Sequence, residues 1–385
     1  MLPALLQHGT AAWPDRPALA RAKERAFAAQ VGSAMARHAE SSIFWLHADA
    51  VAGDFLPGRP DQLAEVLSLL QEYALRPRLA STNGGAEAFP EEVFEREQAQ
   101  ALAAARAVFD DKGAYARQQA VQAACEGEPY GLSDHGGEDA IKALDAAAPA
   151  SMLRDFRDHG ERVCVAMGVL PDNFHEALAP LLGQLQATEP GQLAAPVEPA
   201  RREPRSLRES APMQQAKLVL VLRSLRAREP EQLCALQTCL SLWGGGPHSR
   251  LFREVRENKS LCYYASAGGD PNKGLVMVQV GCEGDSVGAV VDESMQQLTE
   301  LQEGRFEDAE LATTKAAIDG SLQAVDDSPG SRLHFTTEQW LRGFDDDPVT
   351  RRQRFARVTR EDVAEAARSI WLDYDYALLP EETRS

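Results

Sequence analysis

The apolar residues of the first half of the chain follow helical spacing in four segments and strand spacing in two. Residues 62–73 illustrate the helical pattern, because Leu63, Val66 and Leu70 fall on one side of a helix. Residues 42–50 alternate in the manner of a half-buried strand. The pattern predicts helices over 17–35, 62–73, 94–109 and 171–185, and strands over 42–50 and 162–170.

The second half of the chain repeats this mixture of strands and helices. Residues 217–222 are almost continuously apolar, which is typical of a buried strand. Residues 262–268 and 275–282 flank a turn segment at 270–274 and predict a strand pair. The other predicted elements are helices over 231–242, 288–301, 307–325, 331–341 and 360–370, and a closing strand over 374–379.

A proline-rich segment separates the two halves. Five prolines lie between positions 190 and 212, a density that disfavours both helix and strand pairing, so we expect an extended linker. The predicted organisation is a first domain over 1–189, a linker over 190–212 and a second domain over 213–385. In both halves strand material comes early, helices follow, and a final strand comes late. The predicted fold class is α+β.

Composition narrows the class of partner. The net charge of −18 argues against nucleic acid, which needs a basic surface, and would attract basic peptides. No apolar run is long enough to span a membrane, and the first residues do not resemble a signal peptide. The six cysteines form no Cys-x-x-Cys pair, which favours reduced thiols, so we expect a cytoplasmic protein without nucleic-acid or membrane partners.

The segment over 243–267 holds the most informative chemistry. Gly244, Gly245 and Gly246 end one predicted helix, and Pro247 suits the start of the next. In that next helix Leu251, Phe252 and Val255 share one face, which should pack on the sheet.

Arg256 and Tyr263 are seven positions apart in this segment, at the end of the predicted helix and on the following strand. We therefore expect them to lie close in space. A guanidinium and a phenol are suitable donors to the oxyanion that develops when a peptide bond is attacked. The alternative is a surface Arg256 paired with Glu254 or Glu257, and a Tyr263 that packs in the core.

The segment over 243–267 resembles the second-domain signature of the pitrilysin-type zinc peptidases, the inverzincin group that includes mitochondrial processing peptidase. Further matching phrases extend the resemblance over nearly the whole chain. They cover residues 215–220, 303–311, 323–330 and 357–363, and, as in a bacterial subgroup without the zinc motif, 110–116 and 128–131. The resemblance implies two similar domains, each a mostly antiparallel sheet covered by helices, that form half of a clamshell chamber.

The zinc motif of this family, His-x-x-Glu-His, is absent from all 385 residues. Pro3 and Ala4 stand where its glutamate and second histidine are expected, ahead of a shared Gly-Thr at Gly9. A third ligand would lie near Glu95 or Glu97, and we expect those acids to lack partners. The resemblance also implies that N-terminal strands of relatives are missing from the first domain.

The resemblance therefore implies a non-catalytic subunit of a heterodimeric zinc metallopeptidase. This chain would hold no metal or cofactor, and a homologous partner would supply the zinc. Arg256 and Tyr263 would hold the scissile carbonyl of a peptide substrate, and further substrate-binding residues would be Gly244, Gly245, Gly246, Ser249 and Tyr264. Two alternatives stay open: a catalytically silent scaffold or binding subunit, and a chain that assists maturation of another protein or a peptide cofactor.

Other sites have weaker support. The eight histidines include no pair at i, i+4 spacing, which argues against a separate metal site. Residues 284–288 match Gly-x-Ser-x-Gly, with Ser286 as the nucleophile and His334 as the base. The predicted antiparallel sheet disfavours that serine hydrolase. The glycines at 244–246 lack the Lys-Ser/Thr of a phosphate loop.

Overall fold

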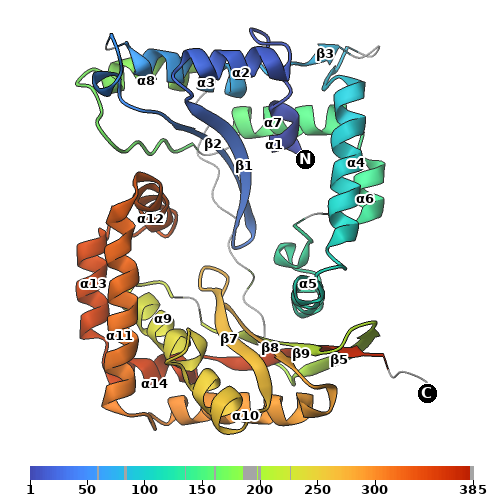
Figure 1. Cartoon of the computed structure of the whole chain (residues 1–385), viewed down its shortest axis with the longest axis vertical. Helices are drawn as coiled ribbons and strands as arrows, with labels where there is room; N and C mark the ends of the chain where they lie inside the picture. Colours follow the sequence, from blue (N-terminus) through green and yellow to red (C-terminus); the bar gives the residue numbers. More distant parts are fainter. Residues whose placement is uncertain are drawn as a thin grey trace. The chain divides into compact units, whose positions relative to one another are not determined.

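The computed structural model describes residues 1–58, 60–81, 85–134, 136–159, 162–184, 197, 201–225 and 227–381. By their internal contacts these residues form two compact units. Unit 1 comprises Met1–Ala107 and Asp134–Ala194, and unit 2 comprises Val108–Ser133 and Ala195–Ser385. Each unit combines helices with sheet, which confirms the two-domain α+β fold (Figure 1).

Unit 1 is mainly helical and contains two short ladders. Its strands pair as two antiparallel hairpins, of which β1–β2 is the longer (Figure 1). Helix α3 packs against both strands of β1–β2. Leu69 and Tyr73 of α3 belong to the main apolar core of unit 1. The elements are α1 (Leu2–Leu6), α2 (Arg16–Arg25), β1 (Gln30–His38), β2 (Ser41–Asp49), η1 (Gly53–Phe55), α3 (Gln62–Leu75), β3 (Ala80–Ser81), β4 (Glu87–Ala88), α4 (Glu91–Ala107), α6 (Glu138–Ala143), α7 (Ala147–His159) and α8 (Phe174–Gln184).

Two predictions for unit 1 are wrong. The helix predicted over 17–35 ends at Arg25, because Phe27 and Ala28 adopt positive φ angles of 52° and 59°, and β1 follows. The alanine-rich composition concealed this break. The strand predicted over 162–170 does not form, and Val163 and Leu170 are exposed. No described strand pairs with it, so its apolar residues have no ladder to join.

Unit 2 is built on a five-stranded sheet in the order β5-β9-β6-β8-β7. All neighbouring strands are antiparallel except β5 and β9, which run parallel. The elements are α5 (Lys112–Ala124), η2 (Pro129–Gly131), β5 (Arg205–Ala211), β6 (Ala216–Arg223), α9 (Pro230–Gly244), η3 (Leu251–Asn258), β7 (Cys262–Asp270), β8 (Leu275–Cys282), η4 (Gly284–Ser286), α10 (Val287–Gln302), α11 (Asp308–Gln323), η5 (Ala324–Asp327), α12 (Pro329–Leu341), α13 (Pro348–Arg357), α14 (Arg360–Arg368) and β9 (Trp371–Pro380).

The central strand β6 is buried on both faces. Leu218 and Leu220 enter the large core shared with α9, α10 and α14, whereas Val219 and Val221 face a second core built with α5. Helix α5 thus covers the sheet face opposite α9 and α10 (Figure 1). This two-sided burial explains the almost continuous apolar run of β6.

The observed boundaries differ from the predicted ones in two places. Residues 108–133, which the sequence placed in the first domain, cluster with unit 2, because α5 packs on β6 and β9. Residues 205–211 of the predicted linker form strand β5 and pair with β9, so the absence of ladder pairing there was a wrong prediction. Prolines flank this stretch at Pro204 and Pro212 but do not interrupt it, and an edge strand tolerates such neighbours. Most of the remaining linker lies outside the described residues.

A buried ionic network holds the end of α5 and the segment after it against strands β6 and β9. Arg223 is fully buried, and its guanidinium donates to Asp373 Oδ2 at 3.0 Å, Glu128 Oε1 at 2.9 Å and the Ala124 carbonyl at 2.8 Å. Lys273 Nζ lies 2.5 Å from Glu128 Oε2. Burial alone would raise the pKa of Asp373, but hydrogen bonds from Arg202 and Arg223 hold it below its usual value.

Replacement of Arg223 by methionine should destabilise the protein by about 3–5 kcal/mol, because it leaves two buried carboxylates without their shared partner. Arg202→Met is the matched control, since Arg202 pairs with the same Asp373 at 2.8 Å but is half-exposed, and it should lose about 1 kcal/mol or less. Urea unfolding followed by tryptophan fluorescence measures both. Equal losses would contradict the central role of Arg223.

Candidate functional site

Gly244, Gly245 and Gly246, here called the glycine corner, join α9 to η3. Because η3 carries Arg256 of the predicted Arg–Tyr clamp, we call it the clamp helix. Gly244 packs against β7 so closely that a Cβ atom would lie 2.4 Å from the Ala267 backbone nitrogen. Gly245 caps α9 with an ordinary negative φ, and only Gly246 has a positive φ, of 151°. The glycines therefore allow α9 and β7 to approach each other and turn the chain toward η3.

The clamp helix η3 is a π-helix, a form that is rare and occurs often at functional sites. Its wider winding is visible at the end, where Lys259 N–H donates to the Glu254 carbonyl, five residues back, at 3.2 Å. Leu251 and Val255 form the fully buried face of η3, as the sequence predicted, and Phe252 is partly buried. The Arg256 side chain, by contrast, is partly exposed.

Two buried polar residues anchor the start of η3. Ser249 has no solvent exposure, and its hydroxyl accepts from Phe252 N–H at 3.4 Å. Arg250 donates to the Gln297 side chain at 2.8 Å and to the Arg305 carbonyl at 2.7 Å, and it pairs with Glu300. The contacts of Arg250 fix the start of η3 against α10 and the segment after it, whereas Ser249 caps the first turn of η3.

Tyr263 lies in a β-bulge at the beginning of β7. Cys262 pairs with Cys282 and Tyr264 pairs with Gly281, so that Tyr263 has no opposite residue on β8. A bulge bends its strand and redirects a side chain, and such bulges are frequent next to active sites. Ser260, with a positive φ of 51°, makes the preceding turn out of η3.

The two predicted clamp side chains are both accessible. Tyr263 is 50% exposed, which rules out the alternative that it packs in the core, and the Arg256 side chain is 39% exposed. Arg256 Nε lies 3.6 Å from Glu257 Oε1, and its guanidinium lies over the Phe252 ring. Helix η3 and strand β7 are in contact, as the sequence predicted.

Glu283 holds the hydroxyl of Tyr263, a contact that sequence reasoning missed. The phenol donates to Glu283 Oε1, and this hydrogen bond, together with the negative charge of Glu283, raises the pKa of Tyr263. Glu283 directly follows β8, opposite the bulge. Little in the sequence indicated this hydrogen bond, because the position of Glu283 near Tyr263 depends on the register between β7 and β8.

Tyr264 is oriented by the sheet itself. Its ring lies over Gly281, where a Cβ atom would approach Tyr264 Cε1 to 2.3 Å, and Lys217 Nζ lies 5.2 Å from its ring centre. Burial raises the pKa of Tyr264, with a smaller contribution from the charge of Asp111. Tyr264 follows Tyr263 in the sequence, and its side chain is 40% exposed.

Among the described residues no group of three or more His, Cys, Asp or Glu side chains is arranged to hold a metal. The expectation that Glu97 lacks partners is wrong. Glu97 is buried, its Oε1 lies 2.6 Å from His8 Nε2, and Arg16 donates to it at 3.3 Å. Arg16 thus supplies a positive charge to this carboxylate, and His8 adds a hydrogen bond.

The serine-hydrolase alternative has no support from the fold. Residues 284–286 form a 3-10 turn, and Ser286 is the N-cap of α10. The preceding strand β8 is antiparallel to both neighbours, whereas a nucleophile elbow follows a strand of an α/β-hydrolase sheet. No described hydrogen bond links Ser286 to His334.

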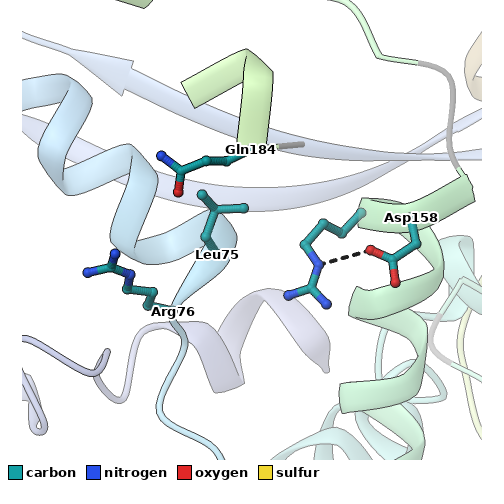
Figure 2. Close-up of a pocket in the computed structure, with 5 residues that line it drawn as sticks. Leu75, Arg76, Asp158 and Gln184 are labelled. Carbon is teal, nitrogen blue, oxygen red and sulfur yellow. Dashed lines mark hydrogen bonds and ion pairs between the residues drawn. The ribbon is translucent and has the colours of Figure 1, made fainter. Parts of the chain in front are cut away.

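An open hollow of about 430 Å³ lies in unit 1, at the ends of α3, α7 and α8 (Figure 2). Its lining residues are Leu75, Arg76, Arg157, Asp158 and Gln184. Arg157 Nε donates to Asp158 at 3.1 Å, and Arg76 lies 3.5 Å from Glu72. The hollow contains no predicted site residue and no nucleophile.

Comparisons with known proteins give the class. Residues 162–318 match the family model described as the peptidase M16 inactive domain. The probable inactive metalloprotease YmfF of Bacillus subtilis is 24% identical over 378 residues, which cover 98% of this chain and 88% of that protein.

Solved structures share the fold. A conserved protein from Enterococcus faecalis V583 superposes with a TM-score of 0.88 at 23% identity, covering 100% of this chain and 89% of that chain. The periplasmic protease PqqL from Escherichia coli superposes with a TM-score of 0.70 at 15% identity, covering 98% of this chain but 40% of that chain.

Residues 162–318 thus match an M16 inactive domain, and nearly the whole chain is similar to a relative named a probable inactive metalloprotease, which agrees with the resemblance found in the sequence. The chain lacks the His-x-x-Glu-His motif. In the part of the chain that is described, no helix has the length and apolar character required to cross a membrane.

Replacement of Glu283 by glutamine should lower the pKa of Tyr263 back toward about 10, because the carboxylate that disfavours the phenolate is removed. Tyrosine ring ¹³C shifts followed over pH measure it, with Tyr263→Phe to assign the signal. Asp285→Asn removes a nearby charge without touching the phenol and should leave this pKa unchanged. An unaltered titration in the Glu283→Gln protein would disprove the contact.

Proposed function

We propose that this chain is the substrate-clamping subunit of a heterodimeric zinc metallopeptidase. A homologous partner carrying His-x-x-Glu-His would supply the zinc and its bound water, which attacks the peptide bond. Arg256 and Tyr263 of this chain would donate to the scissile carbonyl and to the oxyanion formed from it. The observation that carries the proposal is the placement of both donors, accessible, on a π-helix and an adjacent β-bulge.

The rigid support around these donors favours the clamp role. Donors stabilise a transition state best when they are held in place before the reaction. Arg250 ties the clamp helix to α10, Ser249 caps its first turn, and Leu251 and Val255 form its fully buried face. To bind a substrate carbonyl, Tyr263 would exchange its hydrogen bond to Glu283 for one to the substrate.

The need for a partner follows from the missing motif. PqqL, named a protease, contains the fold of this chain within 40% of its own length, which leaves room for a second portion of similar size. We propose that in the present case the second portion is a separate subunit. The excess of acidic residues would favour basic peptide substrates.

A scaffold or binding subunit is the second candidate. The occupied hydroxyl of Tyr263 and the ion pair of Arg256 with Glu257 favour it, because each donor already has a partner in this chain. The two candidates differ in the expected effect of removing Arg256.

Arg256→Ala should reduce turnover of the two-subunit complex by about 10²–10³-fold, because one oxyanion donor is lost, with zinc content and complex size unchanged. Hydrolysis of a mixed peptide pool measures turnover. Arg253→Ala is the matched control, since Arg253 lies on the same helix and pairs with Glu310 at 3.1 Å, and it should retain near-normal turnover. Full activity of the Arg256→Ala complex would exclude the clamp role and favour the scaffold.

Co-expression with a zinc-motif homologue should give a complex that holds about one zinc per pair and cleaves peptides, because the partner brings the complete ligand set. This chain purified alone should have neither zinc nor peptidase activity. Metal analysis and peptide hydrolysis test both preparations. Activity or zinc in the lone chain would contradict the proposal, and an inert but stable pair would favour the scaffold.

A further inference from the structure

Cys262 and Cys282 lie directly opposite each other in the β7–β8 ladder, immediately before the bulge. Residues opposite each other on antiparallel strands have Cα atoms about 4.5–5.5 Å apart and side chains on the same face. A disulfide requires Cα atoms about 4.4–6.8 Å apart. The ladder therefore already holds this pair at a separation that a disulfide can bridge.

Both cysteines are free thiols on the same side of the sheet. Cys282 is fully buried in the large core of unit 2, and Cys262 is partly buried and packs against that core. No other two cysteines of the described residues are strand partners. The remaining four are buried Cys125, Cys234 and Cys239, and exposed Cys164 in unit 1.

We propose that Cys262 and Cys282 are a reversible disulfide site that controls the neighbouring Tyr263. The oxidant is a low-molecular-weight disulfide. The Cys262 thiolate attacks one of its sulfur atoms, forms a mixed disulfide and releases one small thiolate. The Cys282 thiolate then attacks Sγ of Cys262 and displaces the second small thiolate. The two protons lost by the cysteines end on the two released thiols, so two electrons pass to the oxidant.

The surroundings favour Cys262 as the first nucleophile. Burial raises the pKa of both thiols, for Cys282 to about 11, but the nearby charge of Arg256 counteracts this effect at Cys262. Cys262 is also the more accessible of the two. The exchange should therefore be slow at neutral pH and should accelerate as the pH rises, since the thiolate is the reacting form.

The bond would act on the clamp through its immediate neighbours. Tyr263 follows Cys262, Glu283 follows Cys282, and these two side chains share a hydrogen bond. A covalent link across the ladder fixes the separation of the two backbones at this point. The oxidised form should therefore keep Tyr263 on Glu283 and rigidify the bulge, whereas the reduced form leaves the bulge held by hydrogen bonds alone.

Oxidised glutathione at pH 8.5 is the probe, applied to the folded chain in a Cys164→Ser background that removes the exposed thiol. Trypsin cleaves after Lys259, Lys273 and Arg305, so the proposed bond joins peptides 260–273 and 274–305. Mass spectrometry should detect this linked pair, lighter by two hydrogens than its separate components, and a reductant should separate it. Cys282→Ala should stop at the mixed disulfide on Cys262, and Cys239→Ser should leave the yield unchanged.

Hydrogen exchange of peptide 260–273 tests the effect on the bulge and should be severalfold slower in the oxidised protein than in the reduced one. Failure of the linked pair to form in the folded chain, or its formation only in urea, would overturn the proposal. A linked pair with unchanged exchange would overturn the control of Tyr263. Neither measurement depends on a partner subunit or on peptidase activity.

Discussion

Burial of strand β6 on both faces is the constraint on which unit 2 depends. A strand in that position needs apolar cover on each side, and the helices that follow it in the sequence cover only one. The other side is covered by α5, which the chain supplies before the linker. Arg223 makes this arrangement specific, because its buried guanidinium joins the end of β6 to β9 and to the segment after α5.

The same network gives a structural role to residues 128–131, which in the sequence served only as evidence of the family resemblance. Glu128, in the phrase over 128–131, accepts from Arg223 and pairs with Lys273 from the β7–β8 turn. A buried carboxylate with two cationic partners has little freedom to be replaced. The phrase therefore has a structural function, to hold residues 108–133 on unit 2 and to fix the far end of the hairpin that starts at the clamp.

The clamp itself is built from exceptions to regular structure. In an α-helix and an unbroken strand, side-chain directions follow from the periods 3.6 and 2. Arg256 and Tyr263 instead take their directions from a π-turn and a bulge, each fixed by contacts with the core around it. Local irregularity of this kind is maintained only where the surroundings determine it, here through Arg250, Ser249 and the glycine corner.

Sequence periodicity predicted most elements of unit 2, because these depend on neighbours close in the chain. It failed where the decisive partner is distant. Strand β5 forms because β9 is available to pair with it, whereas the segment predicted as a strand over 162–170 pairs with no described strand. Glu283 was missed for the same reason, since its contact with Tyr263 exists only through the hairpin register.

The charge balance of unit 1 bears on where a metal would be found. A buried carboxylate needs a cation or a proton nearby, and in a zinc site the metal can meet that need. Here Arg16 supplies a positive charge to Glu97, the acid that the family pattern places near a third ligand, and His8 adds a hydrogen bond. Glu97 thus has its compensating groups within the chain. A zinc ion at this position would have to displace an arginine and a histidine that already hold the carboxylate, with Pro3 and Ala4 offering no ligand in return.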